Sequence, residues 1–374
     1  MVCSIVCEYN PFHKGHERQI QYLKGQGHQV ICIMSGSFVQ RGETAVYSKW
    51  IRTKWALLAG ADLVLELPVF YSLQSAQGFA RGAIASLYAT GMVDAVSFGM
   101  EVQDVSTLQS MARLQQSDGF SLALKAHLAA GLSYPRAMEQ AAKESLTDLP
   151  LEAFSPNSLL GVEYLKAMAE LHWSPALLPL HRGADSPTAT SCRGEIHLGQ
   201  QPNGVPGYVQ RDLTSLTPAK LEDLTQLILY RLRTMDPDSL AMVEDVSEGL
   251  HNRIITAAKQ HHDLPSMMDA VSSGRYTRAR VRRIICCALL GITKAELDPY
   301  RKTPPYIRVL GVQGKERSLL GKLTKNCTVP VISSSKDFSS VPLFQKELMA
   351  TELYSIATHQ NSGADYTTPL IVTP

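Results

Sequence analysis

The chain has 374 residues, which is enough for two or three domains of ordinary size and excludes a single small module. Its hydrophobic share of 45% and charged share of 19% are typical of folded proteins and exclude a disordered chain. Lys and Arg number 36 and Asp and Glu 34, so the formal net charge is +2. That total is too small to indicate a nucleic-acid partner by itself.

The seven cysteines are an odd set without a Cys-x-x-Cys pair or a ligand spacing typical of zinc. We therefore expect a reducing compartment, no disulfide framework and no metal site. The N-terminus reaches an acidic residue, Glu8, too early for a signal peptide. The most apolar region, 56–73, carries Asp62, Glu66 and Pro68, so it cannot supply about twenty uncharged residues for a membrane span. These features predict a cytoplasmic protein without a membrane partner.

Apolar, β-branched segments alternate with segments of helical periodicity, which predicts an α/β fold with a parallel sheet. The expected strands are 4–8, 30–34, 63–67, 95–98 and 177–180. The expected helices between them are 17–24, 49–59 and 72–88. In such a sheet, ligands bind at the carboxyl ends of the strands.

A segment rich in Pro and Gly, 201–207, predicts a linker. It would separate an α/β domain, 1–200, from a mostly α-helical region, 208–374. In that second part we expect helices at 221–234, 276–290 and 344–357 and a short strand at 329–332.

The densest group of chemically useful residues is Glu8-Tyr-Asn-Pro-Phe-His-Lys-Gly-His16, between the first strand and a helix. Gly15 permits a close backbone approach, so His13 and His16 can face one anionic group while the helix N-terminus supplies amide donors. Donors aimed at an α-phosphate stabilise the charge that develops when an attacking oxygen displaces pyrophosphate. An isolated His-x-x-His is more often two surface histidines in a turn. The strand-loop-helix context favours a triphosphate site here.

This segment resembles the His-x-Gly-His signature of the nucleotidyltransferase superfamily. The chain as a whole resembles the bacterial tRNA(Met) cytidine acetate ligase family, nearly from end to end. The further motifs that carry this resemblance are Met34–Glu43, Gly60–Pro68, Phe98–Glu101, Pro156–Gly161, Arg275–Arg283 and Tyr306–Gly311.

The resemblance implies a Rossmann-like nucleotidyltransferase domain in residues 1–200 and a reaction in two steps. Acetate would attack the α-phosphate of ATP, giving acetyl-adenylate and pyrophosphate. The wobble cytidine of elongator tRNA(Met) would then take the acetyl group and become N4-acetylcytidine. Acetyl-CoA would not be needed, and Mg²⁺ would arrive with ATP. The catalytic residues would be His13 and His16.

The resemblance also implies the ATP-binding residues, which are a continuous segment after the first strand and three positions further along the chain. The segment consists of Val6, Cys7, Glu8, Tyr9, Asn10, Pro11, Phe12, His13, Lys14, Gly15, His16, Glu17, Arg18, Gln19 and Ile20. The three further positions are Gly99, Asn157 and Arg182. This chain departs from the family's pattern at Ser37, at Ser158 and in a shorter loop at 183–193.

Five of the nine residues from 275 to 283 are arginines, and we expect them to bind tRNA: Arg275, Arg278, Arg280, Arg282 and Arg283. On a helix, Val281, Ile284, Ile285 and Ala288 would share an apolar face, which leaves the arginines for an anion such as the RNA backbone. For this segment alone, a solvated surface helix is the commoner interpretation. Residues 271–330 hold 13 basic and 3 acidic side chains, which the net charge conceals. We therefore expect the tRNA contacts mainly between 275 and 325.

Three other groups of residues each have two possible interpretations. The loop 35–43 is predicted to cover the substrate, with a surface turn as the alternative. Asp62 and Glu66 could bind a ligand or cap nearby backbone. Lys49 and Arg52 could face a phosphate or lie on a solvated helix face.

Two other classes of function stay open. One is a small-molecule adenylyltransferase or carboxylate ligase that uses the same histidine motif. The other is a tRNA-binding protein without catalysis. The basic segment argues against the first, and the intact His13, Gly15 and His16 argue against the second.

Overall fold

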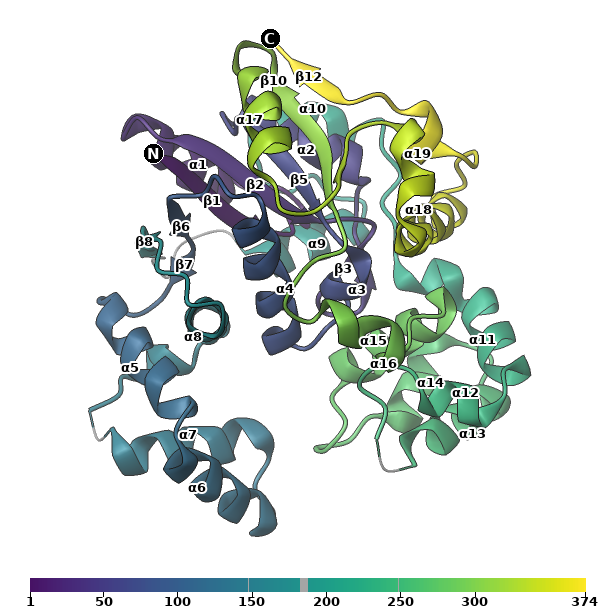
Figure 1. Ribbon diagram of the computed structural model, residues 1–374. Coiled ribbons are helices and arrows are strands. Elements are labelled where there is room, and N and C mark those ends of the chain that lie inside the picture. Colours follow the sequence, from purple (N-terminus) through teal and green to yellow (C-terminus); the bar gives the residue numbers. More distant parts are fainter. Residues whose placement is uncertain (147, 182–187, 248) are drawn as a thin grey trace.

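The computed structural model describes residues 1–146, 148–181, 188–247 and 249–374. An eight-stranded sheet has the order β11-β10-β5-β2-β1-β6-β8, with β12 paired to β10. Figure 1 shows the sheet above two groups of helices, α5–α7 on one side and α11–α16 on the other. The strands of this sheet are β1 (Val2–Cys7), β2 (Gln29–Ser35), β5 (Leu63–Leu67), β6 (Ala95–Ser97), β8 (Ala176–Leu177), β10 (Ile307–Gln313), β11 (Val331–Ile332) and β12 (Ile371–Thr373). The predicted α/β fold is confirmed.

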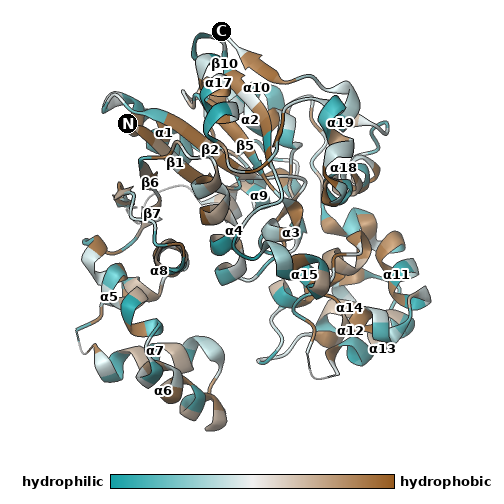
Figure 2. Ribbon diagram, in the orientation of Figure 1, coloured by the Kyte–Doolittle hydropathy of each residue, from teal (hydrophilic) through white to brown (hydrophobic). Residues whose placement is uncertain are grey.

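The central strands are apolar on both faces because helices cover both sides of the sheet. Every residue of β5 and all but the first of β2 are buried, as is typical of interior parallel strands, and Figure 2 shows this apolar character along β1, β2 and β5. β1 pairs in parallel with β2 on one side and β6 on the other. The strand order therefore reverses beside β1, and such a switch point is where open α/β sheets bind their ligands.

The helices of the first half are α1 (Lys14–Gly25), α2 (Lys49–Leu58), α3 (Val69–Ser72), α4 (Ala76–Ala89), α5 (Val105–Gln115), α6 (Asp118–Ala129), α7 (Tyr134–Ser145), α8 (Pro156–Glu170) and α9 (Ala189–His197). Those of the second half are α10 (Gly207–Leu213), α11 (Thr225–Thr234), α12 (Pro237–Ala241), α13 (Leu250–Gln260), α14 (Leu264–Val271), α15 (Arg278–Leu290), α16 (Lys294–Leu297), α17 (Ser318–Asn326), α18 (Gln345–Ala357) and α19 (Ala364–Thr367). Each predicted helix is found, but 72–88 is divided between α3 and α4.

The sheet is mixed rather than wholly parallel, because β10 from the second half runs antiparallel to β5. The second half is mostly helical, as expected, yet it supplies three strands to the same sheet. The prediction missed β10 because Arg308 and Gly311 interrupt its apolar pattern, although all seven of its residues are buried. The division of the chain at 201–207 stays a prediction, and the two parts on either side of it share one sheet.

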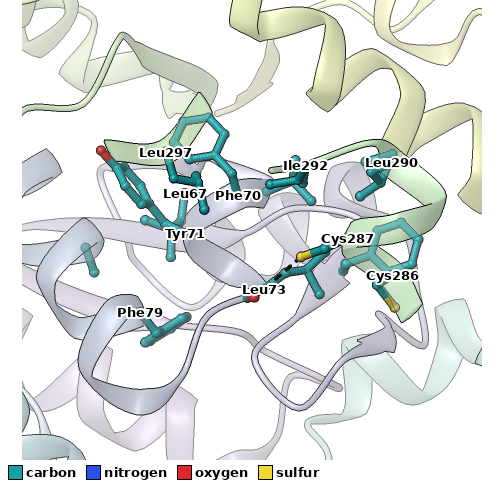
Figure 3. Packing of buried hydrophobic residues seen from close by; sticks show 14 of the residues in the cluster. Leu67, Phe70, Tyr71, Leu73, Phe79, Cys286, Cys287, Leu290, Ile292 and Leu297 are labelled. Atoms are coloured by element: carbon teal, nitrogen blue, oxygen red, sulfur yellow. Dashed lines mark hydrogen bonds between the residues drawn. The ribbon is translucent and has the colours of Figure 1, made fainter. Parts of the chain in front are cut away.

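The apolar face of α15 packs against the first half of the chain. Figure 3 shows Cys286, Cys287 and Leu290 beside Phe70 and Leu73, with the Cys287 Sγ atom 3.9 Å from the carbonyl oxygen of Leu73. The four residues expected on the apolar face of this helix are all buried: Val281, Ile284, Ile285 and Ala288. Burial of this face stabilises the position of the arginines on the same helix.

A buried ion network joins α2, β5, β10 and α19. The Glu66 carboxylate binds Lys49 at 2.8 Å and Arg308 at 2.9 Å. The Asp365 carboxylate binds the same two cations at 3.0 Å and 2.7 Å. Both expectations for Lys49, a phosphate or a solvated face, are wrong, since its side chain is 1% exposed and bound to these carboxylates.

Asp62 and Glu66, the acidic residues of the 60–68 motif, have structural roles, which was one of the two interpretations of these residues. Glu66 is the centre of the ion network. Asp62 accepts hydrogen bonds from the backbone N–H of Val30 at 2.7 Å and from the Lys24 ammonium, also at 2.7 Å. Each carboxylate thus fixes the position of a neighbouring strand or helix.

Glu347 on α18 is a third carboxyl group beside this network. Its Oε2 atom accepts hydrogen bonds from the Tyr306 hydroxyl at 3.0 Å and from the Val69 N–H at 2.8 Å. Burial, together with the nearby charge of Glu66, raises the pKa of Glu347 to about 8. This group is therefore protonated in the folded protein at neutral pH.

Glu347→Gln should remove part of the pH dependence of stability. The folded pKa of about 8 lies above the value of about 4.3 for an unfolded glutamate, so the folded state binds more protons between these two values. The free energy of unfolding of the wild type should fall as the pH rises through this window, whereas the variant should lack this contribution and be the more stable protein at high pH. Urea denaturation from about pH 5 to about pH 9 measures it.

Glu222→Gln, at an exposed position, is the matched control and should follow the wild type. Parallel curves for wild type and Glu347→Gln across the whole range would contradict the raised pKa.

Candidate active site

Two segments of the expected ATP site, the loop after β1 and the Gly99 segment after β6, lie at the carboxyl edge of the sheet. β1 ends at Cys7 and its parallel neighbour β6 ends at Ser97, so the loops that follow them lie side by side. The Gln19 amide on α1 donates to the Ser97 hydroxyl at 2.9 Å. The short strands β7 (Gly99–Met100) and β9 (Leu180–His181) pair just beyond β6. The site lies at the switch point between β1 and β6.

His13 and His16 form a reciprocal cap at the start of α1. The Nδ1 atom of His13 accepts a hydrogen bond from the N–H of Gly15 at 3.1 Å, and Nδ1 of His16 accepts from the N–H of His13 at 3.2 Å. The two rings stack with their centroids 3.6 Å apart. Because each Nδ1 is an acceptor, the proton of each neutral ring lies on Nε2. The cap therefore leaves Nε2–H as the donor of each ring.

The loop before this cap packs around the aromatic ring of Tyr9. The buried ring of Tyr9 lies 4.8 Å from the ring of Phe12 and 4.8 Å from that of His16, and its hydroxyl is 3.2 Å from Cys32 Sγ. Tyr9 adopts a left-handed backbone conformation, with φ 49°, which turns the chain sharply after the strand. Packing below the loop thus sets the orientation of His16.

Arg52 on α2 holds the ends of β1 and β2 together. Its guanidinium is fully buried and donates to backbone carbonyls only: Tyr47 at 2.9 Å, Glu8 at 2.6 Å, Ser35 at 2.9 Å and Gly36. Both expectations for Arg52, a phosphate contact or a solvated face, are therefore wrong. The sequence indicated the residue but not this role, because its four acceptors come from three separate segments.

The loop expected to cover the substrate is a small hairpin of β3 (Phe38–Val39) and β4 (Glu43–Thr44). At its tip, the Gln40 N–H donates to the Glu8 carboxylate at 2.7 Å. At its other side, Glu43 forms an ion pair with Arg282 of α15. The hairpin is thus a bridge between the site and α15 rather than a surface turn.

Glu101 joins the loop after β6 to the start of α8. Its carboxylate accepts hydrogen bonds from the Asn157 amide, from the Ser155 hydroxyl, and from Ser158 at 3.0 Å and 3.1 Å. Burial raises the pKa of Glu101, but these hydrogen bonds outweigh it and leave the pKa below its ordinary value. The sequence analysis missed Glu101 as a residue of the site, although it belongs to the Phe98–Glu101 motif.

The structure gives the remaining residues of the expected ATP site different surroundings. Cys7, Phe12 and Ile20 have side chains in the core, so contact with ATP from them would come from the backbone. Lys14 is tied to the 203–204 segment, donating from Nζ to the Asn203 carbonyl at 3.0 Å. Asn10 accepts from the Val46 N–H at 2.7 Å. Arg182 lies outside the described residues.

One further residue of the site was not predicted. Arg193 on α9 donates from Nη1 to the Asn10 carbonyl at 2.6 Å, and its charge opposes the rise that burial causes in the pKa of Glu8. The sequence signal for it was present in the 188–193 segment, which was noted only as a departure from the family.

The arginines of α15 and the loop before it have two kinds of surroundings. Arg283 is buried and binds the Asp245 carboxylate at 2.9 Å. Arg280 donates to the Asp245 carbonyl and to the Ser247 hydroxyl, each at 2.8 Å. Arg275 and Arg278 are exposed, and Arg278 pairs with Asp269 at the surface. The tRNA contact expected of Arg283 is therefore wrong as a surface contact, because its guanidinium lies inside the protein.

The basic segment 271–330 does not form one surface. β10 starts opposite Glu66 at the carboxyl end of β5 and finishes beside Leu63 at the amino end. The residues after it therefore lie at the opposite edge of the sheet from the site, where Glu316 binds Gln29 at the start of β2. The exposed basic residues at that edge are Lys315, Arg317, Lys322 and Lys325.

No group of three or more His, Cys, Asp or Glu side chains in residues 1–146, 148–181, 188–247 and 249–374 is placed to hold a metal ion. No helix within these same ranges has the length and apolar character that a membrane span requires.

The strand order and the histidine cap define a nucleotidyltransferase of the His-x-Gly-His type, and comparison with known proteins agrees. The family model described as HIGH Nucleotidyl Transferase matches residues 1–368. The tRNA(Met) cytidine acetate ligases of Acetivibrio thermocellus and of a Thermoanaerobacter strain are 32% and 34% identical, and in each case 99% of both chains is covered.

A solved structure shows the same fold. The structure of Thermotoga maritima TmcAL bound with alpha-thio ATP is similar with a TM-score of 0.91 and 29% identity, covering 99% of both chains. The chain belongs to the tRNA(Met) cytidine acetate ligase family, a family of ligases with the nucleotidyltransferase fold.

Arg283→Ala and Arg278→Ala should change different properties of the protein. Loss of Arg283 leaves the Asp245 carboxylate without its guanidinium, which should lower the free energy of unfolding by about 2 kcal/mol. Loss of exposed Arg278 should leave stability within about 0.5 kcal/mol of the wild type and weaken binding to RNA, with a smaller dependence of affinity on salt. Chemical denaturation and filter binding at several salt concentrations measure the two effects. Equal losses of stability would show that the two arginines are not distinguished in this way.

Proposed function

We propose that this protein activates acetate with ATP and transfers the acetyl group to the wobble cytidine of elongator tRNA(Met). The observation that carries the proposal is the histidine cap at the switch point, which has the donors that a displacement at an α-phosphate requires. The names of its relatives, tRNA(Met) cytidine acetate ligases, support the same reaction.

In the first step, an acetate oxygen attacks the α-phosphorus of ATP and pyrophosphate leaves. Negative charge grows on the phosphate oxygens during this displacement. The Nε2–H groups of His13 and His16 are held by the cap before the reaction, so they need little reorganisation to stabilise that charge. The product is acetyl-adenylate, in which the acetyl carbonyl is activated.

In the second step, the exocyclic amine of the cytidine attacks this carbonyl and AMP leaves. The tRNA has to place its anticodon at the carboxyl edge of the sheet. The exposed Arg275 and Arg278 lie just before and within the first turn of α15, whose Arg282 contacts the hairpin over the site. These two arginines are the members of the expected set best placed to contact the tRNA backbone.

The same chemistry indicates which small molecules take part and where the protein acts. Mg²⁺ would enter bound to the phosphates of ATP. Acetate itself is the acyl donor, so acetyl-CoA has no role. The seven cysteines are free thiols, in keeping with the proposed place of action in the reducing cytoplasm.

Incubation of the purified protein with ATP, labelled acetate and unmodified tRNA(Met), followed by nucleoside mass analysis, tests the reaction. We expect the label in N4-acetylcytidine and a requirement for ATP but not for acetyl-CoA. Acetate-dependent exchange of pyrophosphate into ATP without label in the tRNA would instead indicate a ligase for a small molecule. Absence of both would indicate tRNA binding without catalysis.

His13→Asn should abolish most of the first step without unfolding α1. Asparagine is a good N-cap residue, so the helix start should persist while the Nε2 donor is lost. We expect acetate-dependent ATP–pyrophosphate exchange to fall roughly 100-fold or more, with tRNA binding retained. His262→Ala, which changes an exposed histidine, is the control. Exchange at the wild-type rate in His13→Asn would remove His13 from the active site.

A further inference from the structure

Glu8 is the first residue after β1, the strand beside the switch point. Its side chain is only partly exposed. One carboxylate oxygen, Oε1, accepts a hydrogen bond from the Gln40 N–H of the hairpin at 2.7 Å. Among the described residues, the other oxygen has no hydrogen-bond partner. The carboxylate is thus held at one oxygen by the hairpin, and no described residue donates a hydrogen bond to the other.

The groups that face Glu8 come from four elements. They are Arg52 on α2, Arg41 at the tip of the hairpin, Arg193 on α9 and Tyr164 on α8. Burial raises the pKa of Glu8, and the three arginines oppose this change without cancelling it. The result is a carboxylate that is a better proton acceptor than an exposed glutamate.

A carboxylate in this place is unsuited to bind the phosphates of ATP, because like charges repel. It is suited to a group that carries an N–H and loses its proton during the reaction. The amine of cytosine is such a group, since it must lose one proton after it attacks the acyl carbonyl.

We propose that Glu8 is the base that accepts this proton in the transfer of the acetyl group to cytidine. The inference rests on the proposed function and assigns a residue to its second step. The nitrogen of the amine forms a bond to the acetyl carbon, and the bond between that carbon and the oxygen of AMP breaks. AMP departs with the electron pair of this bond, and the proton of the amine passes to the Oε2 atom of Glu8.

Other acid–base groups at this edge of the sheet are already engaged. The Nδ1 atoms of His13 and His16 accept from backbone N–H groups in the cap. The Glu101 carboxylate receives hydrogen bonds from three residues, and its pKa is lowered as a result. Glu43 is paired with Arg282. Glu8 alone among these carboxylates combines a raised pKa with an oxygen that no described residue contacts.

Glu8→Gln is a sharp test because the new amide keeps an oxygen that can accept from the Gln40 N–H. The hairpin should stay in place while the basic group is lost. We expect transfer to tRNA(Met) in single turnover to fall at least about 100-fold more than acetate-dependent ATP–pyrophosphate exchange. Glu152→Gln, an exposed carboxyl-to-amide change, should leave both rates unchanged.

The pH profile separates a base from a structural residue. Wild-type transfer should rise with pH until Glu8 is ionised and then level off, and the residual transfer of Glu8→Gln should lack this rise. Transfer by Glu8→Gln at the wild-type rate, or with the wild-type pH profile, would overturn the role of Glu8. Absence of acetate-dependent exchange in the wild-type protein would instead overturn the proposed function, so the two failures are distinct.

Discussion

The site is organised by one buried guanidinium, that of Arg52. It has no carboxylate within hydrogen-bond distance in the described chain, and its donors are satisfied by carbonyls at the ends of β1 and β2 and before α2. Burial lowers its pKa to about 10, so it still carries its charge at neutral pH. A buried charge is stable only when its hydrogen bonds are made, and each carbonyl is likewise stable only with its donor. The two loops are therefore held in one relative position, and the orientations of Glu8 and of the hairpin depend on it.

The same constraint reaches the arginine-rich helix. The hairpin that begins after Gly36 touches Glu8 through Gln40 and α15 through Glu43. Gly42 lies between them with φ 70°, and a Cβ there would collide with the backbone of Arg282 and Arg283. A side chain at this position would be strained and would separate the two elements. The candidate site and α15 thus have a fixed distance and register, which the proposed reaction on a macromolecular substrate requires.

Local sequence patterns were enough for the strands β1, β2 and β5, for α1 and for the position of His13 and His16 between β1 and α1, because the residues that determine each of these lie within one turn or strand. The partners of the charged residues could not be predicted in this way. Arg308 and Glu66 are 242 positions apart, and Arg282 and Glu43 are 239 apart, so no spacing reveals them. Their helical spacing left a phosphate contact and a solvated face equally open for Lys49 and Arg52, and tertiary burial overrode both. The antiparallel strand β10 was missed for a related reason. A buried arginine such as Arg308 is stable in a strand only when carboxylates pair with it, and its partners here, Glu66 and Asp365, are distant in the sequence.

The basic residues show why a sum of charges along the chain is a weak guide to an RNA surface. Residues 271–330 carry 13 basic side chains, but the fold divides them among several environments. Arg283 and Arg308 are internal, Arg280 and Arg282 bind neighbouring loops, and the lysines of α17 lie at the edge of the sheet opposite the site. A guanidinium that already has a carboxylate partner gains little from a phosphate, because the first pair has to be broken. Exposure, rather than number, is therefore the better guide, and it reduces the expected set to Arg275 and Arg278.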